Sequence, residues 1–439
     1  MDGPTPWEMV RAVPAIRRSA VGFLTAVARR HGDLVAFPLP RTPVLLVNDP
    51  EGVRRVLVDN ARSYGKATVQ YRALAAVTGQ GLLTSDGPTW RSHRRTVQPA
   101  FHHGRLDAVA TQAVAAAARL RAQWRQAPGG EVDVSGGLFR AALEVVGHVL
   151  ADEDLGPVAR RLVDAVDVAL AAVVAGAQSP LPGSWPTPGR RRLRRAVAEV
   201  DEVCDLLVRT RRARGVGEAD ADVLGLLLAA GLPQQQVRDE LVTFVVAGHE
   251  TVASALTWTL HLLARHPQAQ QRLHAELDAV LGAPGGQREP GWDDLGALRW
   301  TRAVLEESLR LYPPAWVITR TALAEDEVAG VRVPAGTLVI VCTWALHRHP
   351  GVWEAPEEFR PERFLQQERR PGAYVPFGAG PRLCIGRELS LVEGVLLLAA
   401  LLREQQVLPG SGPAPEVESL VTLRPRGGMR LRVRQRTMP

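Results

Sequence analysis

Lysine is almost absent from this chain of 439 residues, in which Lys66 is the only one. The net charge of +7 therefore comes from arginine, and so uniform a choice indicates coding bias rather than a designed phosphate-binding surface. The sequence thus argues against a nucleic-acid partner despite its basic balance. A basic patch on the protein surface would instead attract an acidic partner protein, and this attraction would weaken as the salt concentration rises.

Cysteine is also scarce. The three cysteines, Cys204, Cys342 and Cys384, form no Cys-x-x-Cys spacing, which argues against a disulfide framework or a structural zinc site. Residues 1–30 lack the apolar segment of a signal peptide, and no uninterrupted apolar stretch approaches the roughly 18 residues of a membrane span. We therefore expect a reducing, cytoplasmic location.

Apolar, helix-forming sequence is abundant, with 46% hydrophobic and 23% charged residues. Long segments rich in Ala, Leu, Val and Arg lack Pro and Gly and predict helices. Strand signals are few: Phe37 with 43–47 indicates a short hairpin, and 337–342 indicates a strand that follows Gly336. The predicted fold class is mainly α with a small β region.

Two Pro- and Gly-rich segments, 179–189 and 282–286, predict loops. A cluster of arginines follows the first loop: Arg190, Arg191, Arg192, Arg194 and Arg195. Trp185 beside these arginines suits a mobile lid that contacts a membrane surface. A solvated loop before an amphipathic helix explains the pattern equally well.

The most informative stretch is 377–386, which reads Phe-Gly-Ala-Gly-Pro-Arg-Leu-Cys-Ile-Gly. Gly378 and Gly380 permit positive φ angles and hence a tight turn beneath a flat ligand. The apolar run 389–402 predicts a buried helix, so Cys384 lies near a helix N-terminus, which stabilises a thiolate. A free cysteine is usually a buried structural residue, and we expect that role for Cys204 and Cys342.

This stretch resembles the Phe-Gly-x-Gly-x-Arg-x-Cys-x-Gly signature of the cytochrome P-450 superfamily, whose haem iron is held by a cysteine thiolate. The resemblance implies that Cys384 is the iron ligand, that Arg382 pairs with a haem propionate, and that Phe377 and Gly386 belong to the cofactor-binding residues. Phe377 can pack beside the sulfur and exclude water. It further implies one haem b, held in the triangular, mainly α fold by a single haem domain spanning 1–439.

Other segments extend the resemblance. Glu307 and Arg310 lie three apart on a predicted helix and can pair, and the resemblance adds Arg363 to a network that locks the fold. Trp90 and Arg94, one helical turn apart, resemble the pair that reaches a propionate, although an exposed amphipathic helix has the same pattern. Two further residues are candidates for propionate contacts: Arg320 and His347.

The segment 246–252, Val-Ala-Gly-His-Glu-Thr-Val, lies within the predicted helix 238–266. Gly248 in mid-helix costs about 1 kcal/mol relative to Ala, which hints at a local opening of the helix. Glu250 and Thr251 supply the carboxylate and hydroxyl that proton delivery to oxygen requires. His249 and Glu250 could begin the zinc-protease motif His-Glu-x-x-His, but position 253 is Ala, so the second histidine of that motif is absent. The segment resembles the superfamily's oxygen-activating motif.

The predicted activity is hydroxylation with O2 and two electrons, supplied by a separate ferredoxin and ferredoxin reductase. A peroxide-driven hydroxylase is a neighbouring possibility, but those enzymes usually lack the acid–alcohol pair. A non-catalytic haem sensor or electron carrier would have no use for Glu250 and Thr251.

The substrate is predicted to be apolar. Segments 66–74, 81–84, 247–258 and 311–316 resemble the carotenoid ring hydroxylases of thermophilic and radiation-resistant bacteria, which act at C2 or C3 of the β-ionone ring. A fatty-acid or terpenoid hydroxylase is the alternative. Six residues are candidates for the substrate channel, each equally explained by core packing: Val69, Gln70, Leu74, Ala247, Trp316 and Val317.

Overall fold

The computed structural model describes residues 2–436 apart from 40–41, 152–155, 178–186, 216–221, 285, 287 and 366–369. Most of the predicted loop 179–189, including Trp185, therefore lies outside the described residues. The chain divides into two compact units. Unit 1 comprises Met1–Gly65, Ala113–Ala141 and Thr251–Pro439, and unit 2 comprises Lys66–Gln112 and Ala142–Glu250.

Unit 1 contains a five-stranded sheet in the order β1-β2-β8-β5-β3. Its strands are β1 (Leu34–Phe37), β2 (Val44–Val47), β3 (Tyr64–Gly65), β5 (Ile318–Ala322) and β8 (Leu338–Val341). β1 and β2 pair antiparallel from Leu34↔Val47 to Phe37↔Val44, and β2 pairs parallel with β8. The hairpin predicted at Phe37 and 43–47 and the strand predicted at 337–342 are thus confirmed.

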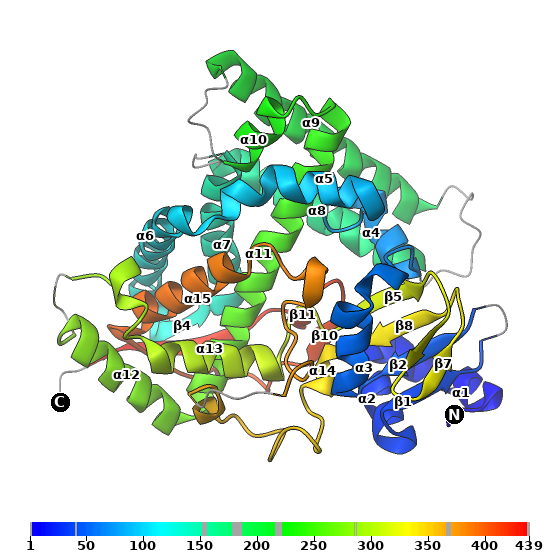
Figure 1. Ribbon diagram of the computed structural model, residues 1–439. Coiled ribbons are helices and arrows are strands. Elements are labelled where there is room, and N and C mark those ends of the chain that lie inside the picture. The colour runs from blue at the N-terminus through cyan, green and yellow to red at the C-terminus, as the bar shows by residue number, and fades with distance from the viewer. Residues whose placement is uncertain are drawn as a thin grey trace. The chain divides into compact units, whose positions relative to one another are not determined.

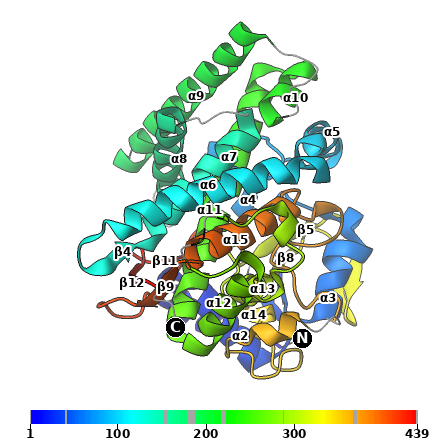
Figure 2. The same cartoon turned by 90° about the vertical axis from the view of Figure 1, so that its left-hand side faces the viewer.

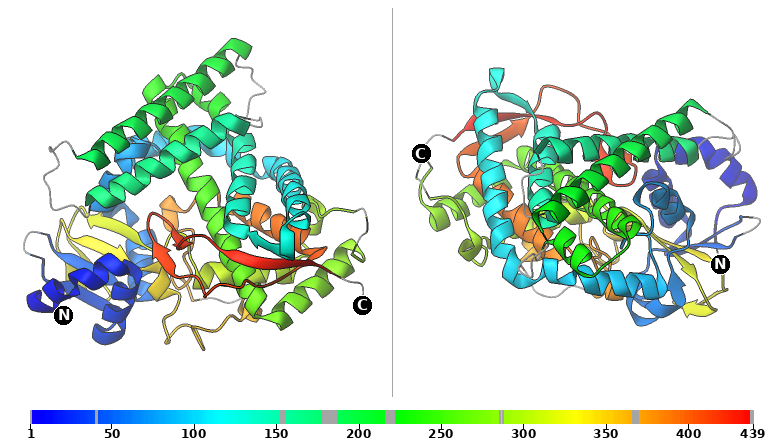
Figure 3. Two further views of the ribbon diagram at one scale, coloured as in Figure 1. Left: turned by 180° about the vertical axis from the view of Figure 1, so that it is seen from behind. Right: turned by 90° about the horizontal axis from the view of Figure 1, so that it is seen from above.

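Three smaller sheets complete the β structure described in unit 1. One has the order β4-β12-β9, and the other two pair β10 with β11 and β6 with β7; the long strand β12 is seen in Figure 3. Their bounds are β4 (Glu131–Asp133), β6 (Asp326–Val328), β7 (Val331–Val333), β9 (Gln405–Pro409), β10 (Val417–Ser419), β11 (Leu423–Pro425) and β12 (Arg430–Gln435).

The helices of unit 1 surround these sheets (Figure 1). They are α1 (Pro6–Arg18), α2 (Ala20–His31), α3 (Pro50–Arg54), α12 (Pro267–Leu281), α13 (Arg299–Leu311), α14 (Thr343–Leu346) and α15 (Arg387–Leu402). α15 confirms the buried helix predicted at 389–402, since every residue from Leu391 to Leu402 is buried. A Cβ at Gly394 would lie 2.7 Å from a methyl carbon of Leu305, so α13 and α15 approach closely at this glycine.

The remaining helices lie in unit 2 or continue from one unit to the other. Unit 2 holds α4 (Val69–Thr78), α5 (Gly87–Val97), α8 (Gly156–Ala177), α9 (Pro188–Arg214) and α10 (Val223–Ala229). α6 (Leu106–Arg125), α7 (Val134–Ala151) and α11 (Gln234–Arg265) have residues in both units. α8 and α9 lie side by side along much of their length (Figure 2).

Short helical turns connect the longer elements. The chain forms a π-helical turn at Arg55–Asp59 and 3-10 turns at Ala61–Ser63, Gln98–Phe101, His103–Arg105, Pro128–Gly130, Trp292–Asp294, Pro361–Phe364 and Gly380–Arg382.

Two helices, α7 and α11, are long and apolar enough to cross a membrane. Their most apolar windows, however, are 61% and 83% buried within the structure. Core helices pass the same test of length and composition, so these two helices are weak evidence for a membrane span.

Candidate functional site

The cysteine loop, residues 377–386, has the tight turns that its glycines predict. Gly378 and Gly380 adopt φ angles of 70° and 65°, a region that side-chain-bearing residues rarely enter. A Cβ at Gly380 would also lie only 2.1 Å from the carbonyl oxygen of Leu57. The Cys384 N–H donates a hydrogen bond of 2.9 Å to the Phe377 carbonyl oxygen, which closes the loop.

Cys384 differs from the other two cysteines in its surroundings. Cys204 and Cys342 are buried, and burial raises the pKa of their thiols to about 12 and about 11 respectively. Both therefore remain protonated and unreactive, as expected for structural residues. Cys384 is exposed and lies three residues before Arg387, where α15 begins, so it lies near the positive end of a helix, which favours a thiolate.

The predicted network of Glu307, Arg310 and Arg363 is present in unit 1. Two guanidinium nitrogens of Arg310, Nε and Nη2, donate to the Glu307 carboxylate over 2.7 and 2.9 Å, and both side chains are fully buried. Arg363 Nε lies 3.3 Å from the same carboxylate. The Arg360 backbone N–H also donates to Glu307 over 2.8 Å. This carboxylate therefore joins α13 to the segment that begins at Arg360.

His347, a candidate for a propionate contact, links this network to the cysteine loop, and backbone groups contact both of its ring nitrogens. Its Nε2 atom accepts a hydrogen bond of 2.9 Å from the Val375 N–H, and its Nδ1 atom lies 3.2 Å from the Arg310 carbonyl oxygen. Burial lowers the pKa of His347 to about 3, so the ring is neutral, with Nδ1 as the donor. The Val375 carbonyl oxygen in turn accepts from the Gly378 N–H, so hydrogen bonds connect α13 to the cysteine loop.

Two other predicted residues of unit 1 are buried on or beside β5. Arg320 is 7% exposed and its Nη1 atom donates to the Thr319 carbonyl oxygen over 2.9 Å. Trp316 is 8% exposed within a core cluster that includes Phe37 and Leu46, and its indole N–H donates to the Leu420 carbonyl oxygen. Core packing therefore accounts for Trp316, the alternative that the sequence left open. Its neighbour Val317 is half-buried.

On α5, in unit 2, the residues of the predicted propionate pair are neighbours. The guanidinium carbon of Arg94 lies 5.8 Å from the centroid of the Trp90 ring. Both side chains are half-buried, so the one-turn spacing places them on the same side of the helix, as predicted.

α11 carries the candidate oxygen-activating residues on a continuous α-helix. The local opening predicted at Gly248 is wrong. A Cβ at Gly248 would lie 2.6 Å from a methyl carbon of Val146 on α7, so close helix packing explains the glycine. Glu250 is 4% exposed, Thr251 is half-buried and Ala247 is exposed. Ala247 and Thr251 are four residues apart, so they form an accessible face on a helix that is otherwise largely buried.

The predicted substrate residues on α4 differ in exposure. Val69 is 64% exposed, Gln70 is half-buried and Leu74 is 8% exposed. Gln70 and Leu74 are one turn apart and share a helix face.

Sequence reasoning missed how the loop between α4 and α5, residues 79–86, is fastened to α11. The Glu240 carboxylate lies 2.6 Å from His93 Nδ1 and accepts a hydrogen bond of 3.0 Å from the Leu82 N–H. The neighbouring carboxylate of Asp239 accepts from the Gln80 N–H over 2.7 Å. Two adjacent acidic residues in a mostly apolar helix were the available signal, because such residues are rarely buried without partners.

The described residues fit an iron porphyrin with a thiolate ligand. Cys384 offers an exposed sulfur near a helix N-terminus, and Gly380 could carry no side chain without colliding with the backbone at Leu57. Within unit 1 the buried Arg320, and within unit 2 Arg94 beside Trp90, are each cations of the kind that hold carboxylates.

Comparison with known proteins identifies the family. The family model for cytochrome P-450 matches residues 1–431. Cyclooctat-9-en-7-ol 5-monooxygenase of Streptomyces melanosporofaciens is 37% identical, over 91% of this chain and 87% of that protein. Protein LUTEIN DEFICIENT 5, chloroplastic, of Arabidopsis thaliana is 30% identical, over 100% of this chain and 78% of that protein. The crystal structure of CYP175A1 from Thermus thermophilus superposes with a TM-score of 0.81 at 32% identity, covering 99% of this chain and 100% of that one. The chain therefore belongs to the cytochrome P-450 family and has its mainly α fold.

Proposed function

We propose that this cytochrome P-450 monooxygenase contains haem b, bound by a single domain over 1–439, and hydroxylates the β-ionone ring of a carotenoid at C2 or C3. The cysteine loop carries the haem assignment, because its exposed thiol lies in a glycine-built turn near the start of α15. The carotenoid assignment has support from the resemblance of 66–74 and 247–258 to carotenoid ring hydroxylases. A relative named for deficiency in lutein, a carotenoid, adds to that support.

Each haem-site residue has a defined role in this proposal. Cys384 ligates the iron as a thiolate, with Phe377 and Gly386 shaping its loop, and Arg382, Arg320, Trp90 and Arg94 hold the propionates. The haem-thiolate group supplies O2 binding and O–O cleavage, which the electron density of the thiolate favours. The protein's own task is to hold that group, exclude water and deliver protons.

Thr251 and Glu250 deliver the protons. Thr251 lies on the accessible face of α11, whereas Glu250 is almost fully buried beside it, so the Thr251 hydroxyl could accept a proton from the Glu250 carboxyl group and pass one on at the accessible face of the helix. Replacing Thr251 with Ala should uncouple turnover, with less product and more peroxide released for each NAD(P)H consumed. If product and peroxide yields both stay at the wild-type values, the proposed proton delivery is wrong.

The substrate contacts in this proposal are Val69, Gln70 and Leu74 on α4 and Ala247 on α11, together with Val317. Long polyenes are apolar, so binding comes from burial of their surface. Ala247 has only a methyl group, which leaves room for a ring beside Thr251.

A terpenoid hydroxylase is the second candidate, because the relative at 37% identity is a cyclooctat-9-en-7-ol 5-monooxygenase. Titrations with β-carotene, a cyclic diterpene alcohol and palmitate distinguish the candidates, since substrate that displaces water from ferric iron changes the Soret spectrum. We expect a spectral shift and a ring-hydroxylated product with β-carotene. A shift and product with the diterpene alcohol alone would establish the second candidate instead.

Electrons come from a ferredoxin and its reductase, as we also propose. The net charge of +7 suits an acidic ferredoxin, and transfer rates should fall as ionic strength rises. The scarcity of cysteine suits a cytoplasmic location, and the loop 179–189 would contact a membrane surface. No nucleic acid has a role in this account.

A further inference from the structure

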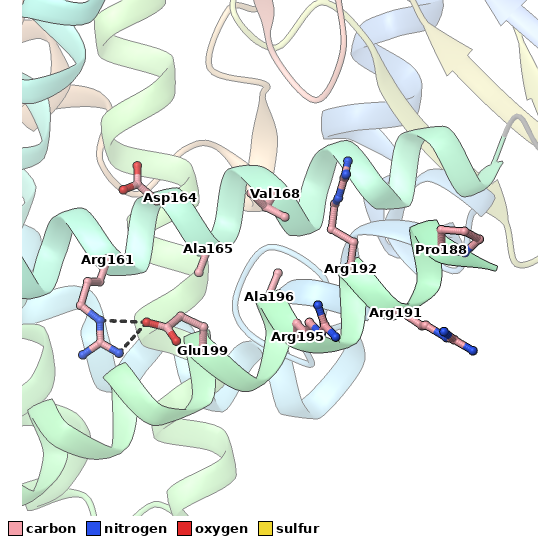
Figure 4. Close-up of a pocket in the computed structure, with 10 residues that line it drawn as sticks. All are labelled: Arg161, Asp164, Ala165, Val168, Pro188, Arg191, Arg192, Arg195, Ala196 and Glu199. Atoms are coloured by element: carbon pink, nitrogen blue, oxygen red, sulfur yellow. Dashed lines mark hydrogen bonds and ion pairs between the residues drawn. The ribbon is translucent and has the colours of Figure 1, made fainter. Parts of the chain in front are cut away.

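A groove with a volume of about 690 Å³ lies between α8 and α9 in unit 2 (Figure 4). Its apolar lining comes from Ala165 and Val168 on α8 and from Pro188 and Ala196 on α9. Four arginines and two acidic residues complete it: Arg161, Arg191, Arg192, Arg195, Asp164 and Glu199. The groove therefore combines a small-residue apolar floor with a basic rim.

The positive charge of this groove is only partly neutralised by the protein. Arg161 donates to Glu199 through two nitrogens, over 2.8 and 2.5 Å, and the pair is drawn with dashed lines in Figure 4. Among the residues that the structure describes, no carboxylate forms an ion pair with Arg191, Arg192 or Arg195. Asp164 is the remaining acidic lining residue, so the groove keeps an excess of cations.

These cations come from one stretch of α9. Five of the eight residues from Pro188 to Arg195 are arginine, and the first turn contains no acidic residue. Positive charges that repel one another, near the positive end of a helix, lower its stability. An anion from outside the chain would relieve both effects, because a guanidinium binds a phosphate through two parallel hydrogen bonds.

We propose that the groove between α8 and α9 binds the phosphate headgroups of anionic phospholipids and so docks this face of unit 2 on a bilayer. Clusters of four or more basic residues on an amphipathic helix are typical of such contacts. Val168, which is 41% exposed in the groove, would meet the apolar part of the lipid below its phosphate. An acidic protein is a poorer occupant of the groove, because it would pair with the arginines and leave the apolar lining without a partner.

The proposal deepens the membrane contact of the proposed function by naming its surface and its lipid class, and it does not depend on the substrate assignment. Vesicle binding needs no substrate, so the two can fail separately. If carotenoid does not bind but anionic vesicles do, only the substrate assignment is wrong. If carotenoid is hydroxylated but vesicles do not bind, only the docking surface is wrong.

The test is co-sedimentation of the holoenzyme with vesicles of phosphatidylcholine alone or mixed with phosphatidylglycerol. We expect binding to the mixed vesicles that falls with added salt. The triple variant R191Q/R192Q/R195Q should lose affinity on the order of 100-fold, since each arginine near an anionic surface contributes roughly fivefold. Its haem spectrum and its turnover of detergent-solubilised substrate should match the wild type.

The matched control is R209Q/R212Q/R214Q, which removes the same charge from the other end of α9. It should keep most of the vesicle affinity. The proposal is overturned if both triple variants lose affinity equally, because general charge would then suffice. The proposal is also overturned if the protein binds neutral and anionic vesicles equally. It is likewise overturned if the protein binds inorganic phosphate or a folded acidic protein but does not bind vesicles.

Discussion

The Nδ1 atom of His93 on α5 lies 2.6 Å from a carboxylate oxygen of Glu240 on α11, and both side chains are almost completely buried. The second oxygen of Glu240 accepts from the Leu82 N–H. The Glu240 carboxylate thus contacts both α5, the helix that carries Trp90 and Arg94, and the loop that precedes α5.

Replacing Glu240 with Gln should lower the free energy of unfolding by about 2 kcal/mol, because a buried hydrogen bond to a charged group is lost. The hydrogen bond to Glu240 raises the pKa of His93 above its ordinary value, with Gln236 and Asp239 also facing the ring. A raised pKa in the folded state gives stability that is full below about pH 6.5 and is lost as the pH rises through the folded-state value.

The cost of E240Q should therefore be largest in mildly acidic solution and smaller in alkaline solution. Urea unfolding of the holoenzyme at several pH values measures this difference. Glu354→Gln, at an exposed position, should leave the free energy of unfolding unchanged. An E240Q cost that does not vary with pH would mean that the pair is not ionised in the folded protein.

Replacing Arg310 with Ala should be among the most damaging changes in unit 1. The fully buried Glu307 would lose its bidentate partner, and removal of one member of a buried pair costs about 3–5 kcal/mol. The variant should also lose haem, because the Arg310 side chain donates through Nη1 to the His347 carbonyl oxygen over 2.8 Å, and the His347 ring holds Val375 just before the cysteine loop.

Haem content after purification and the urea midpoint measure the two effects of R310A. Arg332→Ala is the matched control, because Arg332 forms an exposed ion pair with Glu325 and such pairs contribute about 0–1 kcal/mol. Equal loss in the two variants would show that burial of the Glu307–Arg310 pair has no special role.

Replacing Gly380 with Ala should prevent normal haem incorporation. The added Cβ would lie 2.1 Å from the Leu57 carbonyl oxygen at a φ angle of 65°, so the cysteine loop would have to move. Backbone strain alone costs about 1–3 kcal/mol. Gly412→Ala should be tolerated, since no atom lies within 4 Å of the new methyl group and its φ angle is not positive. Haem bound per chain is the measurement, and full occupancy in G380A would contradict the loop geometry.

Replacing Glu393 with Leu should stabilise the protein by about 1–3 kcal/mol at neutral pH, because an unpartnered buried polar group carries a penalty of this size. Both carboxylate oxygens of Glu393 are buried without a hydrogen-bond partner among the described residues, and burial raises the pKa of this group well above its ordinary value.

For Glu393 the raised pKa means that the folded state holds a proton which the unfolded state releases, so stability falls as the pH rises above about 4.5. The gain from E393L should therefore grow from acidic to alkaline solution in urea unfolding. Lower stability of E393L at neutral pH would indicate that the carboxyl group has a partner, such as bound water.

Predictions from sequence succeeded where the interacting residues are close in the chain. Glu307 and Arg310 are three apart on one helix, so helical periodicity brings them together, and the short apolar run at 43–47 after Phe37 indicated a hairpin. The turns at Gly378 and Gly380 and the helix after Cys384 were also predicted correctly, because they all lie within one short stretch.

The failures concern contacts between distant segments. His93 and Glu240 are 147 residues apart, and no local pattern reveals which buried acid meets which histidine. Gly248 was interpreted as a helix opening because Val146 on another helix, the cause of the small residue, cannot be seen in the local sequence. The backbone partners of the two His347 ring nitrogens, at Arg310 and Val375, are likewise visible only in the tertiary structure.

The identity of the iron ligand is the central claim, and the spectrum of the reduced carbon monoxide complex tests it most directly. The wild type and the variants Cys204→Ser and Cys342→Ser should all show the red-shifted Soret band of a thiolate-ligated carbonyl haem. Cys384→Ser should lose that band. If Cys384→Ser keeps it, or if the wild type never shows it, Cys384 is not the ligand and the account fails.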